Sequence, residues 1–188
     1  MDMEEDIEKQ IKTLKHYVNN EDFLKWMVEW KKDVKKAEKK GLKRPPVTED
    51  IAKSFILIAE HLSNRPNFIN YPFKEDMIGD GIENCIAYAH NFDPEKSNNP
   101  FSYFTQIIYY AFLRRIEREK KQSYIKYKCM QMNDVDGKFV DWLKDNQGSS
   151  TLSEFLQSTF FLSENDIEKM DQKEKAKKKR GKKPKNKS

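Results

Sequence analysis

Apolar positions along the first two thirds of the chain recur every three or four residues, which predicts helices rather than strands. We expect a short amphipathic helix from Ile7 to Val18 and a second helix that Asn20 caps and that ends before Pro45. Thr48 is expected to cap a third helix, whose apolar stripe is Ile51, Phe55, Ile58, Ala59 and Leu62. Only 6 glycines and 7 prolines occur in 188 residues, which also favours an all-α fold.

A fourth helix, from about Lys74 to Phe92, combines an apolar stripe with an acidic one. The predicted buried face consists of Ile78, Ile82, Cys85, Ile86 and Ala89. Asp76, Asp80 and Glu83 make the acidic stripe, and like charges at this spacing repel each other along a helix. A solvated helix face and a docking surface for a basic partner both fit this pattern, which by itself favours neither.

A fifth helix is predicted from Phe101 to about Lys121, with Asn98-Asn99-Pro100 at its start, and it could extend to Lys128. Its predicted inner stripe is Phe104, Ile108, Ala111, Phe112 and Ile116. Its predicted outer stripe is Tyr103, Gln106, Tyr110, Arg114, Arg118 and Lys121. Exposed aromatic rings followed by bases suit stacking on unpaired nucleotides and neutralising phosphates. Buried tyrosines beside a solvated basic face would give the same pattern.

The charge of the chain is distributed unevenly. Its net charge is +5, yet residues 171–188 carry ten Lys and Arg against two acids, which leaves 26 bases and 29 acids elsewhere. A protein that coats DNA nonspecifically would be basic throughout, so a nucleic-acid contact in residues 1–170 must be local. The low-complexity segment 171–188 is predicted to be disordered.

The order of these segments predicts the organisation of the chain. We expect N-terminal helices in 1–46, a compact helical domain in 47–128, a C-terminal extension in 129–170 and the Lys-rich tail in 171–188. The extension begins with an acidic, turn-rich stretch and then contains the apolar cluster Leu152, Phe155, Leu156, Phe160, Phe161 and Leu162.

Motifs for catalysis, cofactors or metals do not stand out. The chain lacks GxxxxGK[ST], GxGxxG and GxSxG, and its three histidines fall on separate predicted helices. Two cysteines without metal-ligand spacing fit a reducing cytosol, and no apolar run reaches the roughly 20 residues that span a membrane. The sequence therefore predicts a non-enzymatic protein that uses no cofactor, metal or membrane. The enzymatic alternative is a small helical nuclease that binds Mg²⁺ through clustered carboxylates.

The segment from Asp76 to Glu95, with its Phe92-Asp93-Pro94 turn, resembles the second conserved region of bacterial sigma factors. The following Asn99-Pro100-Phe101-Ser102-Tyr103-Phe104-Thr105 and Arg114-Arg115-Ile116 are similar to the next helix of that family. Residues 16–128 as a whole resemble the late-transcription sigma factors of T-even-type bacteriophages. The resemblance implies an all-α sigma region 2-like domain in the cytoplasm of an infected bacterium.

The resemblance also implies two interfaces. The first would bind the coiled coil of the β′ subunit of core RNA polymerase, through Asp76, Asp80, Glu83 and Ile86. The second would bind TATA-type promoter DNA, through Tyr103, Phe104, Gln106, Tyr109, Tyr110, Arg114, Arg115, Arg118, Lys120 and Lys121. Ile107 and Ile108 stand where primary sigma factors have two adjacent tryptophans that help to open the duplex. Capture of unpaired bases by the neighbouring tyrosines is the substitute hypothesis.

A third implied contact is with the phage sliding clamp, together with a late-transcription co-activator. The candidate residues are Leu152, Phe155, Leu156, Phe160 and Phe161, and a helix that packs on the rest of the protein is the alternative. A basic-tailed DNA-binding protein that never engages RNA polymerase is the other interpretation of the whole chain.

Overall fold

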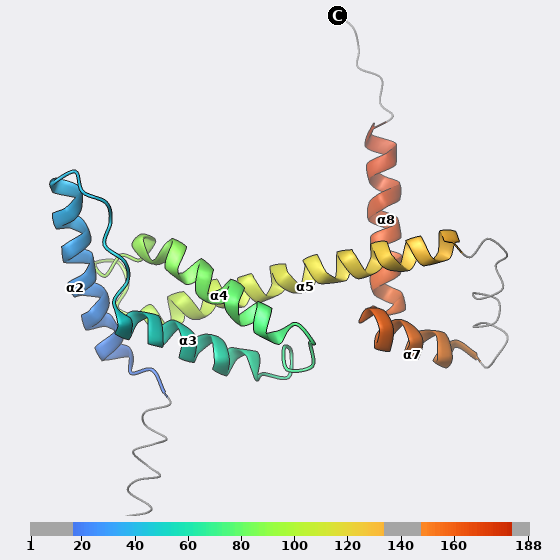
Figure 1. Cartoon of the computed structure of the whole chain (residues 1–188), viewed down its shortest axis with the longest axis horizontal. Coiled ribbons are helices and arrows are strands. Elements are labelled where there is room, and N and C mark those ends of the chain that lie inside the picture. Colours follow the sequence, from blue (N-terminus) through green and yellow to red (C-terminus); the bar gives the residue numbers. More distant parts are fainter. Residues whose placement is uncertain (1–16, 134–147, 182–188) are drawn as a thin grey trace, which may run out of the picture. The chain divides into compact units, whose positions relative to one another are not determined.

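Every regular element in residues 17–133 and 148–181, which the structure (a computed structural model) describes, is a helix. This confirms the all-α expectation. The chain divides into two compact units, Met1–Arg115 and Ile116–Ser188 (Figure 1). This boundary lies inside the segment 47–128 that the sequence analysis assigned to one domain. The helix expected from Ile7 to Val18 lies almost wholly outside the described residues.

The first unit contains α2 (Asn20–Lys39), α3 (Glu49–Ser63), α4 (Lys74–Tyr88), the 3-10 helix η1 (Ala89–Asn91) and the first half of α5 (Pro100–Asn133). A cluster of buried aromatic rings joins three of these helices. The centroids of Phe23 on α2, Phe55 on α3 and Phe104 on α5 lie 4.6–6.0 Å apart, and all three side chains are fully buried. The core of the unit therefore forms where α2, α3 and α5 meet.

Two adjacent asparagines begin α2 and hold the start of α5. The N-cap of α2 is Asn19, not the predicted Asn20, and its Oδ1 accepts a hydrogen bond from the Glu21 N–H at 2.9 Å. The side chain of Asn20 instead reaches the N-terminus of α5. Its Nδ2 donates to the Asn98 carbonyl and its Oδ1 accepts from the Phe101 N–H, both at 3.2 Å. A residue that looks like a local cap thus makes a long-range contact.

The predicted buried face is confirmed for α3, whereas for the fourth predicted helix it is confirmed at Cys85 and Ala89 and wrong at the isoleucines. The buried residues of α4 are Met77, Gly81 and Cys85, followed by Ala89 in η1, whereas Ile78 and Ile82 are half-buried and Ile86 is exposed. The reason is Gly81, where an added Cβ would lie 3.0 Å from Ile108 and 3.1 Å from Phe112 of α5. Because α5 packs directly against this glycine, the buried face is centred on a residue that carries no hydrophobic side chain.

The second unit consists of the remainder of α5 with α7 (Gly148–Phe160) and α8 (Glu164–Gly181). Its core contains Tyr124, Tyr127, Leu156, Phe160 and Leu162. Two ion pairs join α5 to α8, Lys120–Asp166 at 2.8 Å and Lys128–Asp171 at 2.9 Å. The disorder predicted for 171–188 is wrong as far as Gly181, because α8 continues to that residue through Lys, Glu, Gln and Ala, which are good helix formers.

None of the helices within the described ranges is long and apolar enough to cross a membrane.

Candidate nucleic-acid interface

Aromatic and polar side chains of α5 line an open groove of about 540 Å³ in the first unit. Its wall is formed by Leu62, Arg65, Asn99, Phe101, Ser102, Thr105, Gln106, Tyr109 and Tyr110. Tyr109 is 37% exposed and its ring packs edge-on against the buried ring of Phe68, with centroids 5.6 Å apart. Tyr110 is 50% exposed. The groove therefore presents two rings, of which one is anchored against the core.

A second open cavity, of about 440 Å³, shares Tyr110 with this groove. The other lining residues are Asn84, Tyr88, Ile107 and Arg114. Tyr88 is 49% exposed at the end of α4, and sequence reasoning missed it because it belongs to neither stripe of that helix. Tyr110 thus stands between two hollows, each with an aromatic neighbour and an arginine in its lining. An unpaired base could stack on either side of such a ring.

Ile107 and Ile108 of α5 have different environments. Ile107 is half-buried and lines the second cavity, whereas Ile108 is fully buried against α4. Only the first of the two positions therefore lies at the surface that a nucleic acid could reach.

Two of the predicted aromatic platforms are not surface rings. Phe104 is fully buried in the core, so in this fold its ring offers no open face to a base. Tyr103 is half-buried, and its ring contacts those of Phe92 at 5.3 Å and Phe104 at 5.1 Å. Burial and the nearby Cys85 raise the pKa of the Tyr103 hydroxyl above its usual value. Tyr103 has a structural role in which only part of its ring is open to solvent.

The predicted DNA-binding and polymerase-binding residues meet at Arg115. Its guanidinium lies 2.9 Å from the carboxylate of Asp76 and 3.4 Å from that of Asp80. The side chains of Arg115 and Asp80 are 17% and 21% exposed, so this pair is largely shielded from water. The neighbouring Arg114 is exposed and donates a hydrogen bond to Asn84 at 2.9 Å. Of these two arginines, Arg114 is therefore the one that is presented to the second cavity.

An exposed part of the acidic stripe remains on α4. Glu83 is exposed and, within the described residues, takes part in no ion pair. Ile86, one turn along the helix, is 48% exposed, so the sequence prediction that it is buried is wrong. Glu83 and Ile86 together present an acidic and an apolar group on the same face of α4.

The remaining bases assigned to DNA lie in the second unit. Lys120 is paired with Asp166, and its side chain is 25% exposed. Arg118 and Lys121 are exposed, and Lys121 lines a cavity of about 330 Å³ together with Lys173 and Glu174. The basic face predicted as one stripe is thus divided between two units, and α8 supplies carboxylates to part of it.

The residues assigned to the sliding clamp form much of the core of the second unit. Leu156 is 1% exposed and Phe160 is 9% exposed, so in this fold both side chains lie in the core of the second unit and not at its surface. Phe155 packs against the same core, and Phe161 is 41% exposed. Leu152 lies within α7 but outside the residues whose side chains are described. The alternative of a helix packed on its own unit describes α7 better.

Within the described residues, no three His, Cys, Asp or Glu side chains converge on a position that a metal ion could occupy. Cys85 is buried and its thiol donates a weak hydrogen bond to the Phe104 carbonyl at 3.9 Å. Burial raises the pKa of this thiol to about 12, so it stays protonated at neutral pH.

Comparison with known proteins adds no relative, since neither a protein-family model nor a curated protein sequence matches this chain.

Proposed function

We propose that this protein is a sigma factor that directs bacterial core RNA polymerase to late promoters of a bacteriophage and takes part in promoter opening. The observation that carries the proposal is Tyr110, half-exposed between two open cavities on a helix that also presents Gln106 and Arg114. Opening a duplex costs base-stacking energy, and stacking on an aromatic side chain returns about 1–3 kcal/mol per base. The first unit then acts as a sigma region 2-like domain without catalytic activity.

Within this proposal, unpaired non-template bases of a TATA-type element stack on Tyr110 and Tyr109. Arg114 and Arg65 lie at the two cavities and neutralise phosphates of the same strand. Tyr88 offers a further ring in the second cavity. The tyrosines thereby take the place of the tryptophan pair that Ile107 and Ile108 replace.

Polymerase docks, in the same proposal, on the exposed face of α4 that carries Glu83 and Ile86. A carboxylate facing a basic helix of the β′ coiled coil gives orientation and fast association, and the adjacent apolar side chain gives buried area. Asp76 and Asp80 contribute mainly through Arg115, which they hold against α5.

The test is capture of core RNA polymerase by the full chain and by the variant Glu83→Lys. This position is preferable to Asp80, because reversal of Asp80 would also break the pair with Arg115 and confuse docking with folding. Glu60→Lys on α3 is the matched control, since Glu60 is also an exposed glutamate within a helix. Loss of capture in Glu83→Lys alone supports docking through α4. Failure of the unaltered chain to capture core enzyme from its own host would overturn the sigma-factor proposal.

The second candidate function is a DNA-binding protein that does not engage polymerase. It is favoured by the basic residues of α8, of which Lys173 and Lys175 are exposed. DNA binding that survives while polymerase capture is absent would select it. Attachment to a sliding clamp forms no part of the proposed function, because Leu156 and Phe160 would have to leave their core.

A further inference from the structure

The C-terminal half of α2 and the segment after it carry a concentration of positive charge that the sigma-factor proposal does not use. Residues 31–44 contain eight Lys and Arg and two acids, which gives this segment a net charge of +6. Residues 1–170 as a whole have a net charge of −3. The basic patch is defined here as Lys32, Lys35, Lys36, Lys39, Lys40, Lys43 and Arg44. All seven of these side chains are exposed.

Contacts with the rest of α2 hold the end of this patch in place. Gly41, with φ +67°, reverses the chain after α2, and the Leu42 N–H donates to the Ala37 carbonyl at 2.9 Å. The buried ring of Trp30 donates from Nε1 to the Pro46 carbonyl at 2.8 Å. Both ends of the segment 41–46 are therefore fastened to the helix, which keeps Lys43 and Arg44 beside its C-terminal end.

Most of the patch is not neutralised by the protein itself. Lys36 pairs with Asp33 at 3.0 Å, and Lys35 lies 3.6 Å from Glu95 in a pair that is well exposed to solvent. The other five members of the patch form no ion pair with any residue that the structure describes. Lys32 and Lys35 also line an open cavity of about 580 Å³ between α2 and the turn at residues 91–96. Uncompensated cations gathered on one side of a helix create a local positive potential that attracts a polyanion.

The chemistry of the patch distinguishes between polyanions. Protein interfaces are depleted of lysine and centred on apolar or aromatic anchors, whereas Leu42 is the only large exposed apolar residue here. Binding to a lipid surface needs an apolar helix face, but the apolar face of α2, which includes Phe23, Met27 and Val34, is buried in the core. Single-stranded nucleic acids are held by aromatic stacking, and residues 31–47 contain no aromatic side chain. A row of lysines alone fits the phosphate backbone of a duplex.

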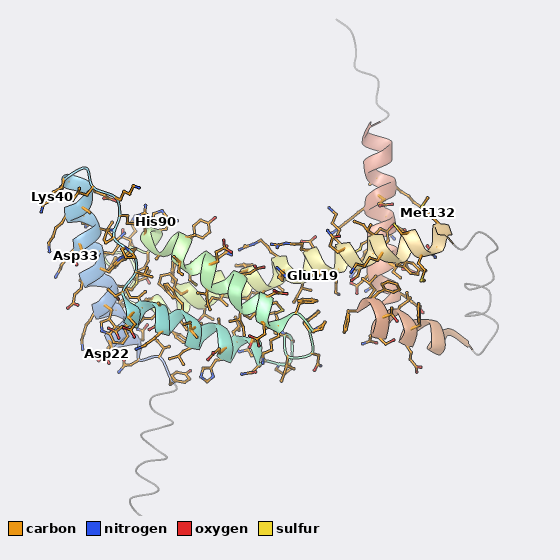
Figure 2. The ribbon with its side chains drawn as sticks, viewed as in Figure 1. Asp22, Asp33, Lys40, His90, Glu119 and Met132 are labelled. Carbon is orange, nitrogen blue, oxygen red and sulfur yellow. The ribbon has the colours of Figure 1, made fainter. Side chains whose placement is uncertain are left out.

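We propose that the basic patch of α2 binds the phosphate backbone of double-stranded DNA, at a place distinct from the groove of Tyr109 and Tyr110. Figure 2 labels Asp22 and Lys40 near opposite ends of α2, and the first turns of this helix are the part that contacts α5 through Asn20. A helix of 20 residues is about 30 Å long, so the patch begins well away from that contact. This contact with duplex DNA does not depend on the base sequence of the DNA, and the inference does not rest on polymerase binding.

The experiment measures the affinity of the full chain for a fluorescent duplex without promoter sequence, by anisotropy, over a series of salt concentrations. The variant is Lys32→Gln/Lys39→Gln, and the control is Lys25→Gln/Lys53→Gln, which removes the same charge from exposed lysines that are paired with Asp22 and Glu49. Each lost phosphate contact lowers the slope of log K against log salt by about 0.9, so we expect a decrease of about two. Between about 50 and about 200 mM salt, the unaltered chain should then lose roughly tenfold more affinity than the variant.

A decrease in slope in the patch variant but not in the control supports the proposal. Lys43→Gln/Arg44→Gln, outside the helix, should act in the same direction and guards against an effect on helix stability. Equal slopes for the variant and the unaltered chain would overturn the proposal, as would an equal decrease in the control. If the patch variant lost affinity for single-stranded DNA or RNA but not for the duplex, the assignment of the patch to duplex DNA would be overturned. Unchanged DNA binding together with lost polymerase capture would assign the patch to a protein partner instead.

Discussion

Arg115 of α5 lies 2.9 Å from Asp76 of α4, and the same guanidinium reaches Asp80 at 3.4 Å. Arg115, which the sequence analysis assigned to DNA binding, therefore pairs with Asp76 and Asp80, which it assigned to polymerase binding. This pairing fixes α4, the proposed docking helix, against α5, the proposed DNA-binding helix. A change at either proposed surface can act on the other through this arginine, so the two surfaces must be tested with residues outside the pair.

Replacing Arg115 by Met should destabilise the first unit. The substitution removes the guanidinium that lies 3.4 Å from the Asp80 carboxylate, which is 21% exposed, and hydrogen bonds to charged groups contribute about 1.5–3 kcal/mol. We expect the free energy of unfolding to fall by about 1–2 kcal/mol once solvent screening at Asp76 is allowed for. Urea denaturation measures this change in the free energy of unfolding. Lys53→Met, which removes a pair whose side chains are 62% and 80% exposed, is the control and should leave the free energy of unfolding almost unchanged, because solvent screens such a pair. Equal effects of the two substitutions would contradict the shielded character of the Arg115 pair.

Alanine at the two glycines of α4 should have opposite effects on stability. Around Gly79 nothing lies within 4 Å of an added Cβ, so Gly79→Ala should raise the free energy of unfolding by about 0.5–1 kcal/mol through helix propensity. At Gly81 the added methyl would press on Ile108 and Phe112, and overpacking of this kind costs about 1–3 kcal/mol. Thermal unfolding of both variants checks the difference. A stabilising Gly81→Ala would mean that α4 and α5 are not in close contact.

Removing the ring of Tyr110 should impair the capture of unpaired bases without affecting folding. The ring is 50% exposed, and loss of one stacked base corresponds to about 1–3 kcal/mol, or roughly 5-fold to 150-fold weaker binding of a non-template oligonucleotide. Anisotropy titration with Tyr110→Ala measures this loss, and permanganate footprinting with polymerase reports promoter opening. Tyr110→Phe should retain most of the affinity. Unchanged footprints in Tyr110→Ala would remove this residue from the opening mechanism.

Loss of the Tyr103 ring should act differently from loss of the Tyr110 ring. Because its ring packs against Phe92 and Phe104, Tyr103→Ala should lower the melting temperature as well as any DNA affinity. An unaltered melting temperature of Tyr103→Ala would indicate that the Tyr103 ring does not support the core and is available for base stacking.

The two cysteines should differ in their reaction with a thiol reagent. Cys129 is exposed, so a thiol reagent can reach it directly and we expect it to react quickly at about pH 8. Cys85 should react only as fast as the first unit opens, because its pKa is raised to about 12 by burial. A raised pKa means that the stability from the protonated Cys85 is complete below pH 9.0 and is lost as the pH rises towards about 12. Cys85→Ala should remove that part of the alkaline destabilisation. Equal labelling rates in Cys85→Ala and Cys129→Ala variants would contradict the buried position.

The sequence predicted those features of the fold that depend on residues close together in the chain. The stripes of α3 and of the part of α5 up to Ile116 were predicted correctly, because their apolar residues recur at helical spacing. The start of α5 was also predicted, from Asn99 and Pro100, since capping depends on neighbouring residues. Tyr110 was identified as a surface ring by the same periodicity. The groove around it was not, because Leu62 and Arg65 come from a distant part of the chain.

The sequence by itself determined that this protein is built from helices, where α2, α3, α4 and α5 begin to within about one residue, and that its charge is concentrated in separate stretches. Only the tertiary structure decided which face of α4 is buried, because the contact at Gly81 depends on side chains of α5. It likewise decided that Arg115 holds Asp76 and Asp80 and that Leu156 and Phe160 complete a core. Helix formation is governed by residues within one or two turns, whereas pairing and burial depend on segments that the fold brings together from far apart in the chain.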